Sequence, residues 1–197
     1  MYHFNQKETL NPQNYYYFTE GFSKEELSKI YKDVGTLPFK QASTIGQKGD
    51  VDRNIRSSKI KWIPQTSEWE WLYEKLMDMA IMANSVLWDF DLQTALEAIQ
   101  YTEYYASEEG HYNWHQDIGK TFQANRRKVS ITVQLSGPEE YEGGDLQIWS
   151  GGNAYDTAPR GEGTVVVFPS YMMHRVDKVT KGTRRSFVLW VGGDHYR

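Results

Sequence analysis

Three residues of this sequence have the types and the spacing of a metal site. His115 and Asp117 are separated by one residue, and a second histidine, His174, follows much later in the chain. In an extended segment, residues i and i+2 project to the same face, so His115 and Asp117 can approach one ion from two directions. Two imidazoles and one carboxylate on one face of a metal leave the opposite face open, as in non-haem iron sites. The same ligand set also binds catalytic zinc, so the spacing alone leaves both metals open.

A candidate anion site accompanies the metal site. Arg184 lies ten residues after His174. The planar fork of an arginine can hold a carboxylate through two parallel hydrogen bonds, and it keeps its charge when water is excluded. Arg185 is the competing candidate, but in a strand it would point to the opposite face. The sequence therefore predicts a metal and an anionic ligand that act together.

An ordered set of short segments surrounds these residues. The segments are Tyr104–Asp117, Val129–Ser136, Tyr141–Leu146, Gly163–Val176 and Val179–Arg184. Together they resemble the 2-oxoglutarate and Fe(II)-dependent dioxygenases of the prolyl 4-hydroxylase-like group, including the bacterial and phage PKHD-type hydroxylases. The resemblance covers about residues 95 to 192, whereas the first ninety or so residues match only loosely.

This resemblance implies a reaction and a set of cofactors. Enzymes of the group hydroxylate an unactivated C–H bond with Fe(II) and O₂, and they convert the cosubstrate 2-oxoglutarate to succinate and CO₂. Ascorbate is a candidate stimulant. The resemblance places Fe(II) on His115, Asp117 and His174, and it places the distal carboxylate of 2-oxoglutarate on Arg184.

Further cosubstrate contacts also follow from the resemblance. They are Tyr105, with Tyr104 as the alternative in a shifted register, and Gln134, Leu146 and Trp190. Gln134 stands where a related prolyl hydroxylase pattern has tyrosine, so the sequence departs from the pattern there. An apolar Leu146 is equally compatible with an ordinary core position.

Composition limits the other classes of protein. With 197 residues, 39% of them hydrophobic and 15% aromatic, the chain can bury one sizeable core, and we expect a single oxygenase domain over residues 1–197. A net charge of −4 gives no broad basic surface, so no nucleic-acid partner is expected. The sequence shows no long apolar run and no signal peptide, and no membrane partner is expected. Since there are no cysteines, nitrogen and oxygen must hold any metal, and a cytoplasmic location is expected.

The pattern of elements predicts a mainly β fold with flanking helices. Capping boxes at Ser23–Glu26 and Ser67–Glu70 predict two helices, the second of which ends near Asn84. Residues 40–57 favour a loop or loose hairpin, and Lys59–Ile63 alternates like a strand. From Thr94 onward, short strands alternate with turn residues, which favours a double-stranded β-helix (jelly roll). We therefore expect a catalytic core at 94–192 and a helical and strand support region at 1–93.

The substrate is the least determined feature of the sequence. The resemblance favours a prolyl residue in a peptide or protein, and a free amino acid or another small molecule is the alternative. A zinc hydrolase, a cupin-like isomerase and a non-catalytic interaction domain remain competing classes. We expect substrate to enter beside Asp117, with residues 44–58, a candidate lid, and residues 118–127 forming the rim. Candidate contacts are the arginines of these segments: Arg53, Arg56, Arg126 and Arg127.

Overall fold

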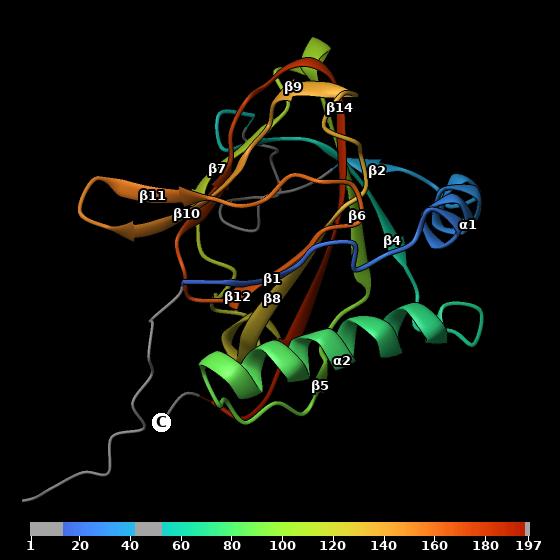
Figure 1. Cartoon of the computed structure of the whole chain (residues 1–197). Helices are drawn as coiled ribbons and strands as arrows, with labels where there is room; N and C mark the ends of the chain where they lie inside the picture. Colours follow the sequence, from blue (N-terminus) through green and yellow to red (C-terminus); the bar gives the residue numbers. More distant parts are fainter. Residues whose placement is uncertain (1–13, 42–52, 196–197) are drawn as a thin grey trace, which may run out of the picture.

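The computed structural model describes residues 14–41 and 53–195, and it shows two antiparallel sheets with two helices outside them (Figure 1). The major sheet has the order β1 (Tyr16–Phe18), β12 (Val165–Pro169), β8 (Arg127–Gln134), β14 (Val179–Gly192), β6 (Ile99–Tyr105), β4 (Lys59–Ile63) and β2 (Lys40–Gln41). Two short strands, β5 (Thr94–Ala95) and β9 (Tyr141–Gly143), also pair with β14.

The minor sheet carries the sequence segments that predict a metal site. Its order is β11 (Ala154–Thr157), β10 (Leu146–Gly151), β13 (His174–Val176), β7 (His111–His115) and β3 (Arg56–Ser57). Short 3₁₀ helices at Ala106–Glu108 and Ala124–Arg126 connect strands of the two sheets. The expected mainly β jelly roll with flanking helices is confirmed.

The first helix begins where the sequence predicts. In α1 (Lys24–Gly35), the Glu26 amide donates to Ser23 Oγ at 3.3 Å, and the Ser23 amide donates to Glu26 Oε2 at 2.7 Å. This reciprocal capping box satisfies two backbone donors that the first turn of a helix otherwise leaves unpaired. Leu27, Ile30 and Val34 are the buried face of the helix.

The second helix departs from the prediction at both ends. The structure starts α2 (Glu70–Leu87) after Trp69, without a side-chain cap, so the expected box at Ser67–Glu70 does not form. Trp69 is 2% exposed, and burying an indole is worth more than the roughly 1 kcal/mol of a cap. Asn84 lies inside the helix, where its side chain bonds both the amide and the carbonyl of Phe90. Asn84 therefore holds the turn that follows the helix.

Strands from the first part of the chain pair with strands of the second part in both sheets. β1 pairs with β12, β4 pairs with β6, and β3 pairs with β7. The expected loop or hairpin at 40–57 begins with β2 and ends with β3, and its residues 42–52 lie outside the described residues.

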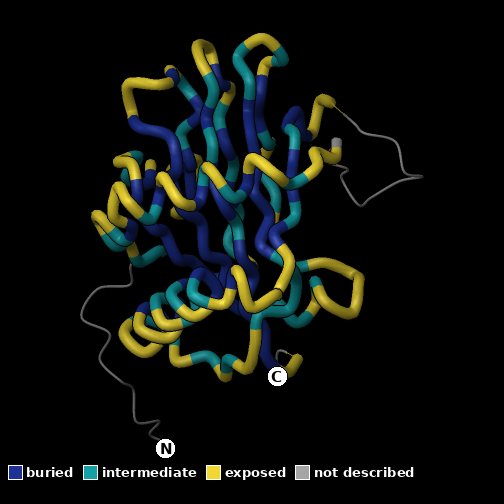
Figure 2. The backbone as a smooth tube through the Cα atoms, turned by 90° about the vertical axis from the view of Figure 1, so that its right-hand side faces the viewer, coloured by how far each residue is buried: buried dark blue, intermediate teal, exposed yellow. Residues whose placement is uncertain are grey.

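The two faces of the major sheet have different chemistry. On β14, Phe187, Leu189 and Val191 join the hydrophobic core that includes residues of both helices. Alternate residues of the same strand, such as Arg184 and Ser186, are buried on the opposite face. Figure 2 shows that buried residues follow the strands, while exposed residues gather at the turns. Neither described helix combines the length and apolar character that crossing a membrane requires.

Candidate metal centre and cosubstrate pocket

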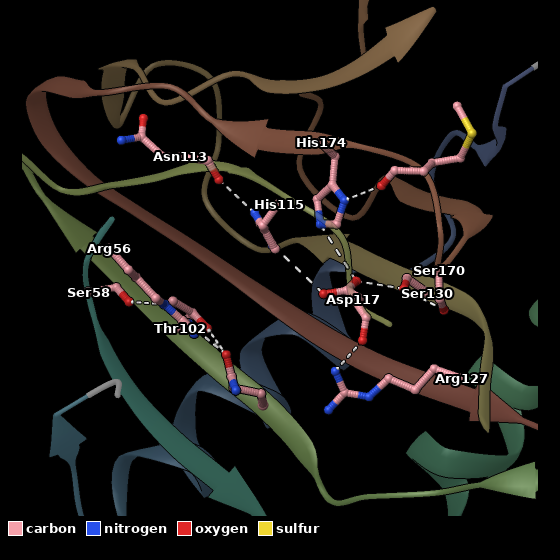
Figure 3. Close-up of polar contacts among 12 residues, drawn as sticks. Arg56, Ser58, Thr102, Asn113, His115, Asp117, Arg127, Ser130, Ser170 and His174 are labelled. Carbon is pink, nitrogen blue, oxygen red and sulfur yellow. Dashed lines mark hydrogen bonds and ion pairs between the residues drawn. The ribbon is translucent and has the colours of Figure 1, made fainter. Parts of the chain in front are cut away.

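The His–Asp–His cluster forms where β7 and β13 pair. His115 and His174 are cross-strand partners in the register of these strands, and Asp117 follows two residues after the end of β7. One oxygen of Asp117 lies 3.8 Å from His115 Nε2, and the other lies 3.6 Å from His174 Nε2 (Figure 3). One ligand atom from each of the three residues fits within 4.8 Å of the others. These separations suit atoms that share one ion, since each ligand lies about 2 Å from its metal.

Backbone carbonyls orient both imidazoles. His115 Nδ1 lies 2.7 Å from the carbonyl oxygen of Asn113, and His174 Nδ1 lies 2.9 Å from that of Met172. A carbonyl accepts only from a protonated Nδ1, so each Nε2 keeps its lone pair for a metal. The two nitrogens and one carboxylate fit a divalent iron, and the sequence has no cysteine to supply a thiolate.

Asp117 is fixed as a carboxylate by its neighbours. Ser130 Oγ donates to Asp117 Oδ2 at 2.6 Å and also contacts Ser170 Oγ at 2.9 Å (Figure 3). Burial alone would raise the pKa of Asp117, but His174, His115, the Ser130 hydrogen bond and Arg127 together lower it. The carboxylate is therefore ready to bind a cation without first losing a proton.

The His115 ring is held in its neutral form. Burial and the nearby His174 lower the pKa of His115 to about 3, although Asp117 and the Asn113 carbonyl act to raise it. A neutral imidazole is the form that binds metals. The ring also stacks on Tyr112, with centroids 3.5 Å apart and planes 14° from parallel, so its tilt is fixed as well.

A cavity of about 390 Å³ extends from this cluster between the two sheets. Both sheets line it: His174 and Leu146 come from the minor sheet, and Arg184, Ser186 and Trp190 come from β14. The prediction that Arg184 and Arg185 point to opposite faces of the strand is confirmed. Arg184 faces the cavity, whereas Arg185 contacts Glu140 and Glu103 on the other face.

Arg184 is a buried cation without a carboxylate partner among the described residues. It is 1% exposed, Nη1 donates to Ser186 Oγ at 3.2 Å, and Nη2 donates to Gln134 Oε1. Its Nε has no hydrogen-bond partner in the described part of the chain. Because a buried unpaired charge is costly, an anion is the expected complement in the cavity.

The residues around Arg184 fix its side chain. Gln134 Nε2 donates to the Tyr141 hydroxyl at 2.8 Å, which turns the Gln134 carbonyl oxygen toward Arg184. Gly144 has φ 65°, and a Cβ there would lie 3.1 Å from Arg184 Cδ and 2.8 Å from Val179. Gln134 therefore supports the arginine, although it is not among the residues that line the cavity.

Tyr105 is not where we expected it. Its hydroxyl donates to Glu103 on the outer side of the major sheet, and its ring faces Lys59. Tyr104, the alternative in a shifted register, lines the cavity, with Arg184 over its ring at 5.5 Å. The reason is the alternation of β6, which places Gln100, Thr102 and Tyr104 on one face.

The structure separates the four candidate substrate arginines. Arg56 and Arg127 line the cavity. Arg126 does not, because its guanidinium bonds the Gly193 carbonyl at 2.9 Å and Gln93 at 3.1 Å. Arg53 is exposed and is also not among the lining residues. Of the expected rim, residues 118–121 and Ala124 line the cavity, while 44–52 lie outside the described residues.

Several residues of the site were missed by the sequence analysis. Ser130 and Ser170 bond Asp117 or each other, and Arg127 Nη1 donates to the Asp117 carbonyl at 2.9 Å. Nothing in the local sequence marks these serines, because they reach Asp117 only through the pairing of β8 and β12. Tyr112 could have been predicted to lie near the site, since it is in the same segment as His115.

Comparisons with known proteins agree with this geometry. The model of the 2OG-Fe(II) oxygenase superfamily matches residues 99–192. A PKHD-type hydroxylase of Acinetobacter baumannii (strain SDF) is 30% identical over 177 residues, which cover 86% of this chain and 74% of that protein. A PKHD-type hydroxylase of Prochlorococcus marinus (strain MIT 9515) is 27% identical over 170 residues, covering 85% and 73% of the two chains.

Solved structures share the fold. A prolyl hydroxylase from Trichoplax adhaerens, in complex with a hypoxia inducible factor oxygen degradation domain peptide fragment, has a TM-score of 0.76 at 16% identity. That comparison covers 93% of this chain and 86% of that one. A Pseudomonas putida prolyl-4-hydroxylase has a TM-score of 0.59 at 18% identity, covering 85% of this chain and 99% of that one.

A jelly roll that encloses a His–Asp–His cluster and a buried arginine defines the class of 2-oxoglutarate-dependent dioxygenases. The chain belongs to the 2-oxoglutarate and Fe(II)-dependent oxygenase superfamily, in its prolyl 4-hydroxylase-like group. It is therefore a dioxygenase that uses Fe(II), 2-oxoglutarate and O₂. The zinc hydrolase, cupin-like isomerase and non-catalytic alternatives do not agree with this membership.

Proposed function

We propose that this enzyme hydroxylates a prolyl residue in a peptide or protein. The observation that carries the proposal is the likeness of the whole fold to a prolyl hydroxylase that binds a peptide, at a TM-score of 0.76. The relatives named PKHD-type hydroxylases support the same chemistry. A cavity of about 390 Å³ that is bordered by residues 118–121 can admit a side chain while the peptide backbone stays outside.

In this proposal, His115, Asp117 and His174 hold Fe(II), and Arg184 binds the distal carboxylate of 2-oxoglutarate. Bound iron and cosubstrate supply the oxidation of the C–H bond, with release of succinate and CO₂. The protein orients both ligands: the Nδ1 contacts set the imidazoles, Ser130 sets Asp117, and Gln134 sets Arg184.

The walls of the cavity position the cosubstrate and exclude water. Leu146 and Phe168 give an apolar side, and Tyr104 covers the Arg184 guanidinium. Trp190 lines the cavity, and its buried indole N–H has no partner among the described residues, so it is free to donate to a bound ligand. Substrate then enters on the Asp117 side, where residues 118–121 line the cavity and Arg127 bonds the backbone of Asp117.

We further propose that the chain forms one oxygenase domain, with residues 1–93 supporting the core at 94–192. The pairing of β1, β3 and β4 with strands of the later region supports this proposal, because neither part can complete both sheets alone.

Proline-containing peptides and free amino acids should be screened with the Fe(II)-loaded enzyme. We expect succinate formation that depends on a prolyl peptide, together with a mass gain of one oxygen on its proline. Turnover of a small molecule alone, with prolyl peptides inert at concentrations that saturate related sites, would refute the proposed substrate class.

A further inference from the structure

Arg56 is a second buried guanidinium in the cavity. Its side chain is 6% exposed, Nε donates to Ser58 Oγ at 2.7 Å, and Nη2 donates to Gln100 Oε1 at 2.7 Å (Figure 3). Both acceptors are neutral. Within the described ranges, no carboxylate forms an ion pair with Arg56, and its Nη1 has no hydrogen-bond partner.

The position of this charge is close to the metal cluster. The Arg56 guanidinium lies over the Tyr112 ring at 4.6 Å from its centroid, and the Tyr112 ring also stacks on His115 with centroids 3.5 Å apart. The charge therefore lies next to the aromatic ring that stacks on a candidate metal ligand, in the cavity that Arg184 also lines.

Among the buried groups of the cavity, the charges would cancel except at Arg56 once Fe(II) and 2-oxoglutarate are bound. The two positive charges of Fe(II) offset the two negative charges of 2-oxoglutarate, and Asp117 offsets Arg184. Arg127 is neutralised by Glu97, whose Oε2 lies 2.5 Å from Arg127 Nη2. One buried positive charge is left, and a buried charge without a counter-charge destabilises the protein.

Two exposed lysines add positive charge to the lining of the cavity. Lys40 and Lys120 line it and are exposed, although the whole chain has a net charge of −4. Exposed positive charge beside a cavity in an otherwise acidic protein raises the local concentration of anions. The rim and the interior thus select the same kind of ligand.

We propose that the substrate carries a carboxylate and that Arg56 binds it, which positions the target carbon at the metal. The inference rests on the proposed function for the hydroxylation, but not for the prolyl ring. The carboxylate comes from one of two sources: the main-chain carboxylate of an amino acid or carboxyl-terminal residue, or the side chain of an aspartate or glutamate beside the target residue.

Matched acid and amide probes test the charge directly. The probes are L-proline against L-prolinamide, blocked proline tripeptides with Asp or Glu against the same peptides with Asn or Gln, and the other common amino acids against their amides. Binding to the Mn(II)- and 2-oxoglutarate-loaded enzyme is measured by calorimetry, and succinate formation is measured with Fe(II). We expect the acid form to be favoured by about tenfold to a hundredfold, the usual value of a hydrogen bond to a charged group.

Arg56→Gln should remove this preference to within about twofold, while affinity for Mn(II) and for 2-oxoglutarate stays unchanged. Arg175→Gln is the matched control, because Arg175 is also stacked on an aromatic ring, Trp114, and lies on the same sheet but does not line the cavity. The control should keep the preference. The comparison of acid with amide in the unaltered enzyme needs no variant, so it stands even if Arg56→Gln does not fold.

Equal use of acid and amide, a preference that survives in Arg56→Gln, or a panel in which no carboxylate probe binds would each overturn the inference. Preference for the free amino acids identifies the main-chain source, and preference for acidic tripeptides identifies the side-chain source. Arg56-dependent turnover of an acid without proline would keep this inference and refute the prolyl proposal. If neutral prolyl peptides are turned over as efficiently as acidic ones, the prolyl proposal stands and the carboxylate inference is refuted.

Discussion

Two backbone carbonyls, of Asn113 and Met172, decide which nitrogen each histidine presents to the cluster. The His–Asp–His arrangement is therefore oriented before a metal arrives, and removal of one imidazole should not be compensated by rotation of another. His174→Ala should abolish stoichiometric binding of Fe(II) or Mn(II), measured by oxygen-free titration. His195→Ala, which removes an exposed histidine far along the chain, is the control and should bind one metal per chain. Full retention of metal in His174→Ala would exclude this cluster as the iron site.

Arg184 should govern the cosubstrate without governing the metal. Arg184→Ala should weaken 2-oxoglutarate binding to the Mn(II)-loaded enzyme by about 2 to 5 kcal/mol, much of it because the distal carboxylate is left unpaired. The measurement is calorimetric titration with 2-oxoglutarate. Arg185→Ala is the matched control, since Arg185 lies on the outer face with Glu140 and Glu103. An unchanged affinity in Arg184→Ala, or a loss confined to Arg185→Ala, would contradict the assignment.

The residues show what a single sequence can and cannot predict. His115, Asp117 and His174 could be predicted because metal ligation requires particular residue types, and the structure brings them together. Arg184 was predicted from the resemblance, and it lines the same cavity. The Tyr105 prediction was wrong, because an offset of ten residues across a strand, a 3₁₀ turn and a second strand does not determine which face a side chain occupies. The contacts of Ser130 and Ser170 depend on strand pairing between distant segments, which no local pattern encodes.

At the scale of elements, the two helices differ in what starts them. A capping box predicted the first turn of α1 because its partners are three residues apart and need no tertiary contact. The similar pattern at Ser67–Glu70 failed, since Trp69 is buried and the chain turns through the hydrogen bond from the Trp69 amide to the Thr66 carbonyl before the helix begins. In these two helices, the capping pattern predicts the start of the helix correctly where the helix end is exposed, but not where a buried side chain fixes the chain.

This difference gives a matched pair of substitutions. Ser23→Ala should lower the free energy of unfolding by about 1 kcal/mol, because it leaves the Glu26 amide without its acceptor. Ser67→Ala should change it by less than about 0.5 kcal/mol, as is usual for surface substitutions away from such contacts. Chemical denaturation of the metal-free protein measures both. If the two variants lose equal stability, the assignment of the α2 start after Trp69 is wrong.

At the scale of the whole molecule, the candidate ligands connect the two sheets. His115 and His174 belong to the minor sheet, while Arg184 belongs to the major sheet, so 2-oxoglutarate would touch metal on one side and guanidinium on the other. Binding of such a ligand stabilises the folded state in proportion to the logarithm of its concentration over the dissociation constant. Binding of metal and cosubstrate in the cavity should therefore stabilise the packing of the two sheets against each other.

Thermal unfolding should show that stabilisation by 2-oxoglutarate depends on prior binding of the metal. Mn(II) alone should raise the unfolding midpoint, and 2-oxoglutarate should raise it further only when Mn(II) is present, by the equivalent of about 2.7 kcal/mol at a hundred times its dissociation constant. His174→Ala should lose both increments, because chelation of the cosubstrate requires the metal. Arg184→Ala should keep the first and lose most of the second. If 2-oxoglutarate stabilises the metal-free protein as strongly as the Mn(II)-loaded one, the cosubstrate does not bridge the two sheets through the metal, and the proposed orientation of the site is wrong.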